Sequence, residues 1–124
     1  MIKPRILLID DEESILKVYK EKMDLMGLDT LIAAGGEEGI RIASEEKPDL
    51  ILLDIIMPQY NGFDALRKLK LEDNTKDIPV YILTNLQPES SFEKAKEMGA
   101  KGYFVKANYS PETLALEVKK ALNL

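Results

Sequence analysis

The chain has 124 residues, of which 45% are hydrophobic and 31% are charged, and its formal net charge at pH 7 is -5. This length suits one ordinary globular domain with a packed core and is too short for two substantial domains. The acidic balance argues against direct binding to nucleic acid or to an anionic membrane, because both require clustered lysine and arginine. We therefore expect a single domain over residues 1–124 that binds neither.

The chain contains no cysteine and no histidine. Their absence excludes disulfides, thiolate or imidazole metal sites, Ser-His-Asp catalysis and a phosphohistidine carried by this chain. The first apolar run stops at Asp10, so it is too short for a signal peptide, and no other run is long enough to span a bilayer. These features fit a cytoplasmic protein.

The chain begins with a predicted strand and a predicted helix. Residues 5–9 are apolar without alternation, which is typical of a strand covered on both faces. A helix is predicted over residues 13–26, and Gly27 is a natural stop for it. The residues expected on the apolar stripe of this helix are Ile15, Val18, Tyr19, Leu25 and Met26.

The same alternation continues through the middle of the chain. A second strand is predicted over residues 30–33 and a second helix over residues 37–46, which Gly39 weakens. A third apolar strand over residues 50–53 then ends abruptly at Asp54. This segment therefore repeats the pattern of an apolar strand followed by an acidic residue.

The second half of the chain completes the alternation. A helix is predicted over residues 63–71, with Phe63, Leu66 and Leu69 inward, and a polar loop over residues 73–77 follows it. The remaining predicted elements are a strand over 79–83, a helix over 88–99, a strand over 102–105 and a final helix. Ser110 and Pro111 supply the N-cap and the first position of this final helix. Its inward residues are Leu114, Val118, Ala121 and Leu122.

Strict alternation of strands and helices predicts an α/β fold. Such a pattern requires a parallel sheet with helices on both faces, joined by right-handed crossovers. In open sheets of this kind, ligands collect at the carboxyl ends of the strands. The candidate site residues are therefore those that follow the strands, namely Asp10, Asp11, Asp54, Thr84 and Lys106.

Three of these candidates are carboxylates that we expect to lie close together. Asp10, Asp11 and Asp54 repel one another at short range, so either one of them takes up a proton or a divalent cation sits between them. Oxygen ligands alone suit Mg²⁺, Mn²⁺ or Ca²⁺. The structural alternative is an ordinary turn or N-cap, and we expect Asp11 to cap the first helix while it also touches the metal.

The other two candidates suit phosphoryl chemistry. Lys106 can bring an ammonium group to the same pocket, and Thr84 can donate its hydroxyl to a phosphoryl oxygen. A carboxylate can act as the nucleophile of such a transfer and form an aspartyl phosphate. Taken singly, a lysine or threonine at a strand end is usually only solvated, so the prediction rests on the coincidence of all five residues.

The motifs of this chain resemble the receiver domain of two-component response regulators, over essentially its whole length. The matching segments are Ile9-Asp10-Asp11-Glu12, Pro48 to Pro58 around Asp54, Asn61-Gly62, Ile78-Pro79-Val80, Leu83-Thr84 and Gly102 to Lys106. The resemblance implies a flavodoxin-like (βα)5 three-layer sandwich with the sheet order 2-1-3-4-5.

The resemblance also implies a role for each site residue. Asp54 would be the phosphoacceptor, and Asp10, Asp11, Asp54 and the main-chain carbonyl of Ile56 would bind Mg²⁺, with Mn²⁺ as a substitute. Thr84 and Lys106 would contact the phosphoryl group and act with Asp54. Thr84 and Tyr103 would form the switch, with Tyr103 moving inward; the alternative for Tyr103 is a half-buried strand aromatic.

The resemblance implies protein partners for a signalling switch. The phosphodonor would be a sensor histidine kinase or a phosphotransfer protein, and the fourth helix, fifth strand and fifth helix would form the face that contacts a downstream effector. A phosphorylation-dependent homodimer is a further candidate. The chain would not be an enzyme beyond weak autophosphorylation and autodephosphorylation, and its end at Leu124 predicts a stand-alone receiver.

The sequence departs from the family pattern in three places. Ala107 stands where the family commonly has a proline after a cis bond, and a cis bond here would cost about 2.5–4 kcal/mol, so we predict a trans peptide. Asn85 replaces a small residue and either crowds the pocket or hydrogen-bonds the phosphoryl group. Ile56 and Leu86 are apolar and cannot orient a water, which predicts slow autodephosphorylation.

Three other functions compete with the phosphorylated switch. A Mg²⁺-dependent phosphohydrolase would need a second aspartate two residues after Asp54, where Ile56 stands. A flavin or nucleotide carrier would need a phosphate-binding loop after the first strand, where acidic residues 10–13 would repel phosphates. A degenerate receiver would act only as a phosphorylation-independent binding scaffold.

Overall fold

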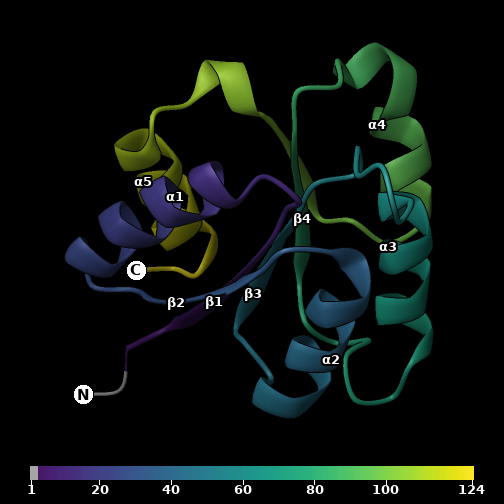
Figure 1. Cartoon of the computed structure of the whole chain (residues 1–124), viewed down its shortest axis with the longest axis horizontal. Coiled ribbons are helices and arrows are strands. Elements are labelled where there is room, and N and C mark those ends of the chain that lie inside the picture. The colour runs from purple at the N-terminus through teal and green to yellow at the C-terminus, as the bar shows by residue number, and fades with distance from the viewer. Residues whose placement is uncertain (1–2) are drawn as a thin grey trace.

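The computed structural model describes residues 3–124. Its centre is a five-stranded parallel sheet with the order β2-β1-β3-β4-β5, so the predicted topology is confirmed. The strands are β1 (Arg5–Ile9), β2 (Asp29–Ala33), β3 (Leu50–Leu53), β4 (Val80–Thr84) and β5 (Gly102–Val105). Figure 1 shows the sheet between two groups of helices.

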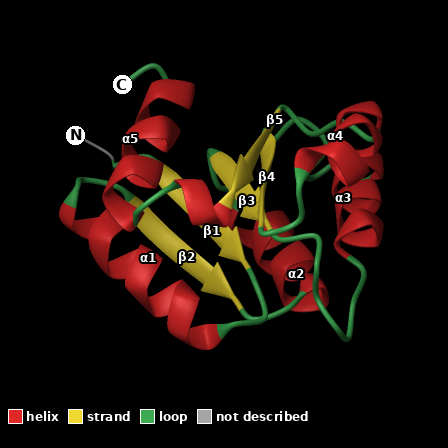
Figure 2. Cartoon of the chain, turned by 90° about the horizontal axis from the view of Figure 1, so that it is seen from above, coloured by secondary structure: helices red, strands yellow, loops and turns green. Residues whose placement is uncertain are grey.

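The helices form the two outer layers of the sandwich. They are α1 (Glu13–Leu25), α2 (Gly36–Glu46), α3 (Gly62–Leu71), α4 (Pro88–Glu97) and α5 (Pro111–Ala121), with a short 3-10 turn, η1 (Lys106–Asn108), between β5 and α5. Helices α1 and α5 lie on one side of the sheet, and α2, α3 and α4 lie on the other (Figure 2). The flavodoxin-like three-layer fold is therefore confirmed.

The unbroken apolar run of β1 follows from this layering. Ile6 and Leu8 belong to the core shared with α1 and α5, whereas Leu7 and Ile9 belong to the core shared with α2 and α3. All four side chains are buried because successive residues of a strand point to opposite faces. The predicted burial of this strand on both faces is confirmed.

The predicted apolar stripe of α1 is wrong in part. Leu16 and Met23 are buried together with Tyr19, whereas Val18 and Leu25 are exposed. This helix carries apolar residues around more than one face, and its packing against β2 and α5 decides which of them is buried. Local periodicity could not make that choice.

Two glycines shape the packing and the ends of the helices, and the predicted stop at Gly27 is confirmed. Gly39 lies within α2 because a Cβ there would come within 2.5 Å of the side chain of Ile9, so close helix–sheet packing offsets its low helix propensity. Gly27 follows the end of α1 with a φ of +93°, the left-handed conformation that ends a helix. At the start of α5, the predicted Ser110 cap is confirmed, since its Oγ accepts the Thr113 N–H at 3.1 Å.

The remaining boundaries differ by a few residues from those expected. Helix α4 ends at Glu97 rather than at Gly99, and β4 begins at Val80 rather than at Pro79. The polar loop over 73–77 is confirmed as a run of turns, with Thr75 buried and its hydroxyl donating to the Leu69 carbonyl at 2.7 Å. Within residues 3–124, none of the helices combines the length and apolarity that a membrane span requires.

Candidate functional site

The parallel register brings the predicted carboxylates to one edge of the sheet. Ile9 and Leu53 are paired on neighbouring strands, so Asp10 and Asp54, which follow them, emerge side by side. Carboxylate oxygens of Asp10, Asp11 and Asp54 all lie within 4.8 Å of one another. Asp10 and Asp54 are 3% and 4% exposed, and Asp11 is the more accessible of the three.

Lys106 joins the two buried carboxylates. Its Nζ donates to Asp10 Oδ2 at 2.5 Å and to Asp54 Oδ2 at 2.9 Å. Burial by itself lowers the pKa of this ammonium group, but the hydrogen bonds to Asp10 and Asp54 outweigh burial, so the pKa of Lys106 is raised. The lysine therefore stays charged and neutralises part of the acidic cluster.

The second oxygen of each buried carboxylate is held by the backbone. Asp10 Oδ1 accepts the N–H of Glu12 at 2.9 Å, and Asp54 Oδ1 accepts the N–H of Ile56 at 3.0 Å. Burial nevertheless raises the pKa of Asp10, since the opposing hydrogen bonds from Lys106 and the Glu12 amide do not fully offset desolvation. The backbone therefore fixes the orientation of both side chains.

The expectation that Asp11 caps the first helix is wrong. The N-cap position is Glu12, which makes no side-chain cap hydrogen bond. The chain turns at Asp11 while the neighbouring Asp10 accepts the Glu12 amide, so the side chain of Asp11 is left at the mouth of the acidic cluster. Its remaining predicted role is that of a metal ligand.

The carboxylate cluster fits a hard divalent cation. Asp10, Asp11 and Asp54 offer oxygen donors close enough to share one ion, and the chain has no sulfur or imidazole donor of the kind that Zn²⁺ prefers. Three carboxylates against one ammonium group leave an excess of negative charge that a cation would neutralise. The donor chemistry therefore suits Mg²⁺ or Mn²⁺.

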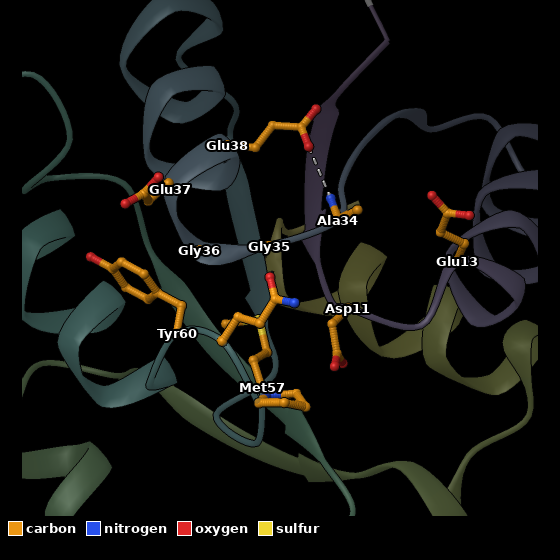
Figure 3. Close-up of a pocket in the computed structure, with 11 residues that line it drawn as sticks. Asp11, Glu13, Ala34, Gly35, Gly36, Glu37, Glu38, Met57 and Tyr60 are labelled. Carbon is orange, nitrogen blue, oxygen red and sulfur yellow. Dashed lines mark hydrogen bonds between the residues drawn. The ribbon is translucent and has the colours of Figure 1, made fainter.

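A pocket of about 740 Å³ opens beside the cluster (Figure 3). In this view Asp11 lies on its right and Tyr60 on its left, with Met57 below and the start of α2 at Gly36 above. The Glu38 carboxylate accepts the Ala34 N–H at 3.3 Å above the pocket. Because Asp11 lines it, the pocket gives solvent and small molecules access to the acidic edge.

Thr84 and Tyr103 lie on the other side of the cluster. Thr84 ends β4, is fully buried, and accepts the Leu86 N–H through its Oγ1 at 3.3 Å. Tyr103 lies on β5 and is half-buried, and its hydroxyl donates to the Leu86 carbonyl at 2.8 Å. Both candidate switch residues therefore meet the same residue, Leu86, in the segment between β4 and α4.

Ser91 is a site residue that sequence reasoning missed. Its hydroxyl, in the first turns of α4, is hydrogen-bonded to the Tyr103 hydroxyl, and Ser91 is 3% exposed. A serine in an amphipathic helix is ordinarily solvated, and nothing in the local sequence ties it to a strand residue twelve positions later.

The positions at which the sequence departs from the family pattern are also defined. No cis peptide bond occurs in residues 3–124, so the predicted trans bond between Lys106 and Ala107 is confirmed. The side chain of Ile56 is half-exposed and Asn85 is exposed, so both flank the site from the solvent side. Neither contributes a side-chain hydrogen bond to Asp54 or Lys106 among the contacts of the described residues.

The family model of the response regulator receiver domain matches residues 6–119. The chain belongs to this family. Receiver domains are signalling domains of two-component systems rather than classical enzymes, and the family binds Mg²⁺ at an acidic pocket. The predicted family and its general class of function are thus confirmed.

Curated relatives of this receiver domain differ in length. Protein PilH of Pseudomonas aeruginosa is 36% identical over 118 residues, which cover 95% of this chain and 97% of that protein. The probable transcriptional regulator ycf27 of Porphyridium aerugineum is 36% identical over 122 residues, which cover 98% of this chain and 49% of that protein. The receiver domain therefore spans about half the length of the ycf27 relatives and nearly all of PilH.

Solved structures agree with the family assignment. The chemotaxis protein CheY4 of Vibrio cholerae superimposes with a TM-score of 0.88 at 27% identity, covering 96% of this chain and 98% of that chain. A response regulator receiver domain protein from Clostridium thermocellum gives a TM-score of 0.84 at 32% identity, with 97% and 94% covered. The similarity extends over the whole sandwich.

Proposed function

We propose that this receiver domain is a phosphorylation-activated switch that takes a phosphoryl group onto Asp54 in a Mg²⁺-dependent reaction. The observation that carries the proposal is the buried Lys106 ammonium bridging Asp10 and Asp54, with Asp11 close enough to share a cation with both. A phosphoryl transfer needs positioned charge more than covalent help from the protein, and this arrangement supplies it.

The proposal makes Asp54 the nucleophile, as the resemblance to the receiver family implies. A carboxylate oxygen of Asp54 attacks phosphorus, and the bond between phosphorus and the donor's leaving group breaks, so the product is an aspartyl phosphate. The backbone N–H of Ile56 holds Asp54 Oδ1 and fixes the orientation of the carboxylate. Lys106 Nζ donates to Asp54 Oδ2 at 2.9 Å, which supports a role for it in contacting the transferred oxygens.

The metal would be held by Asp10, Asp11 and Asp54, with the Ile56 carbonyl as a further ligand. When bound, Mg²⁺ supplies positive charge that reduces the repulsion between the negatively charged phosphoryl oxygens and the Asp54 carboxylate. Asp10 is pre-oriented by the Glu12 amide, so little rearrangement is needed on its side. Mn²⁺, which takes the same ligands, would substitute.

The switch would begin at Thr84. A phosphoryl group on Asp54 would attract the Thr84 hydroxyl. This movement would weaken the hydrogen bond that the Leu86 N–H donates to Thr84 Oγ1. Leu86 is also the acceptor of Tyr103, so the change would reach β5 and α4. Only a difference in the affinity of the phosphoryl group for two arrangements can shift their populations.

The partners follow from the family and remain part of the proposal. The phosphohistidine donor must be another protein, because this chain contains no histidine. It would be a sensor histidine kinase or a phosphotransfer protein, and the transfer would take place in the cytoplasm. The surface of α4, β5 and α5 would contact a downstream effector or a second copy of the domain.

The proposal is tested by phosphoryl uptake from acetyl phosphate, followed by intact-protein mass. The expected result is one phosphoryl group on the wild type with Mg²⁺, none with a chelator, and none on Asp54→Asn. Asp49→Asn is the matched control, because Asp49 is exposed at the opposite end of β3, where its Oδ2 accepts the Arg5 backbone N–H at 2.8 Å. Uptake by Asp54→Asn at the wild-type level would refute the assignment of the acceptor.

The lifetime of the aspartyl phosphate is a second expectation. Because the exposed side chain of Ile56 cannot hydrogen-bond a water, hydrolysis should be slow, and Ile56→Asn should accelerate it. Loss of the phosphoryl mass after removal of acetyl phosphate measures both rates. A wild-type lifetime of seconds that Ile56→Asn leaves unchanged would contradict this expectation.

A further inference from the structure

We propose that Ser91 is a positioning residue of the switch: its hydroxyl holds Tyr103 against the Leu86 carbonyl and thereby ties α4 to the phosphorylation site. This inference rests on the proposed function, because it concerns how the state of Asp54 reaches α4. It assigns a role to a residue that no sequence motif singles out.

The direction of the hydrogen bonds can be worked out from the donors present. Tyr103 has one hydroxyl hydrogen, and it donates this hydrogen to the Leu86 carbonyl at 2.8 Å. Ser91 is hydrogen-bonded to the same phenolic oxygen, so the Ser91 O–H must be the donor and Tyr103 the acceptor. The result is a directed chain from Ser91 through Tyr103 to Leu86, in which each bond polarises the next.

The chain continues to the end of β4. The N–H of Leu86 donates to Thr84 Oγ1 at 3.3 Å, so Leu86 is contacted through both of its backbone polar groups. Ser91 is therefore the end of a connected polar path that starts at Thr84, the residue beside the proposed phosphoacceptor. Both ends of this path are buried.

The packing of α4 makes this path important. The buried residues of α4 are Ser91 and Ala95, whose side chains are small and offer little apolar surface to the core. Around them, Phe92 makes an edge contact with the Tyr103 ring at 6.1 Å between centroids, and Lys94 Nζ lies 4.2 Å from the centroid of the Phe63 ring. With so little apolar anchoring, the position of α4 depends on its contacts with Tyr103.

The bond from Ser91 and the bond to the Leu86 carbonyl hold the Tyr103 hydroxyl between them. Ser91 would therefore favour the inward arrangement of Tyr103 that the phosphorylated switch requires, so that the phosphoryl group has less of the population to shift. Removing the Ser91 hydroxyl would let Tyr103 turn toward solvent, because its ring is only half-buried. A phosphoryl mimic would then bind more weakly, since part of the population would first have to return inward.

The test compares Ser91→Ala with Ser90→Ala. Ser90 is the matched control, because it lies on the same turn and is exposed, and its hydroxyl donates to the Gln87 carbonyl at 2.9 Å. The readouts are fluorine NMR of protein labelled with fluorotyrosine and the affinity for beryllofluoride with Mg²⁺. The resonance of Tyr103 among the five tyrosines is the one missing in Tyr103→Phe.

We expect Ser91→Ala to shift the Tyr103 resonance without ligand and to weaken beryllofluoride binding about fivefold, and Ser90→Ala to change neither. In Tyr103→Phe, the further change Ser91→Ala should have little effect on affinity, because the bond is already absent. An unshifted Tyr103 resonance, or equal affinities in wild type and Ser91→Ala, would overturn the role of Ser91. Failure of the wild type to bind beryllofluoride would instead overturn the proposed function together with its coupling to α4.

Discussion

Helices α1 and α4 are attached to the same sheet in different ways. The buried side chains of α1 are Leu16, Tyr19 and Met23, which reach the core shared with α5. Those of α4 are Ser91 and Ala95. Because hydrophobic stabilisation grows with buried apolar area, at about 25 cal/mol per Å², α1 is firmly anchored and α4 is not.

This difference separates a fixed part of the molecule from a movable part. Helix α1 also binds the edge strand β2 through polar groups: Lys20 Nζ donates to the Thr30 carbonyl at 2.7 Å, and Asp24 Oδ1 accepts the Thr30 N–H at 2.9 Å. Helix α4 contacts the sheet at β5, where the Ser91 hydroxyl is bonded to that of Tyr103, which leads toward the acidic site. A weakly packed element is the one that a small local change can move.

The largest expected effect is on the anchored helix. Leu16→Ala removes a side chain that is 1% exposed and should lower the free energy of unfolding by about 3–4 kcal/mol, from lost transfer energy and a residual cavity. Leu25→Ala on the same helix is the control, because Leu25 is 76% exposed and should cost less than about 0.5 kcal/mol. Urea unfolding measures both, and equal losses would show that the packing of α1 differs from the structure.

The acidic site should be nearly as sensitive as this core. Lys106→Met leaves Asp10 and Asp54 buried without their cation and should cost about 3 kcal/mol without metal. Added Mg²⁺ should restore part of this loss, since it supplies positive charge to the same carboxylates. Lys101→Met, at an exposed lysine, should be neutral; a neutral Lys106→Met would contradict the structure of the site.

A third expectation compares α1 and α4 without mutation. The free energy of the local opening that exposes the amide hydrogens should be about 2 kcal/mol lower for α4 than for α1. The reason is that α4 buries little apolar area against the sheet. Native-state hydrogen exchange followed by NMR measures the two helices in one sample. Equal protection of both helices would remove the basis for treating α4 as the movable element.

The smallest effect concerns the polar contact of α1 with β2. Burial raises the pKa of Asp24, but the hydrogen bonds from Lys20 and the Thr30 amide outweigh it, so the pKa lies below the ordinary 3.8. Because the side chain of Asp24 is 38% exposed and solvent screens its ion pair, Asp24→Asn should cost only about 0.5–1 kcal/mol at pH 7.

The pH dependence of that loss has a definite sign. A lowered folded-state pKa contributes stability above pH 3.8 that is lost as pH falls through the folded pKa, so wild type and Asp24→Asn should converge only in strong acid. Asp73→Asn is the control because the side chain of Asp73 is 93% exposed. A difference between wild type and Asp24→Asn that grows as the pH falls would contradict the assignment.

The sequence was sufficient for the fold and for the members of the acidic cluster. Apolar strands that end in Asp10 and Asp54 can be recognised locally, and the parallel topology then places both residues at the same edge. The exposed face of α1 could not be predicted in the same way, because Leu16 and Val18 are equally apolar and only tertiary packing distinguishes them.

Features that depend on side-chain geometry also lay beyond the sequence. The bridging of Asp10 and Asp54 by Lys106, and the bond between Ser91 and Tyr103, join residues that are distant along the chain or carry no periodic pattern. Asp11 looked like a cap because it precedes a helix, but the turn that begins with Asp10 moves the N-cap to Glu12.

The central claim is that Asp54, the buried carboxylate at the end of β3 to which Lys106 donates, accepts a phosphoryl group. The direct measurement is to phosphorylate the protein with acetyl phosphate and Mg²⁺, reduce the acyl phosphate with borohydride, and sequence the peptides to locate the reduced residue. The account predicts homoserine at Asp54 and at no other position. Homoserine at Asp10 or Asp11 instead, or at none of the three, would contradict it.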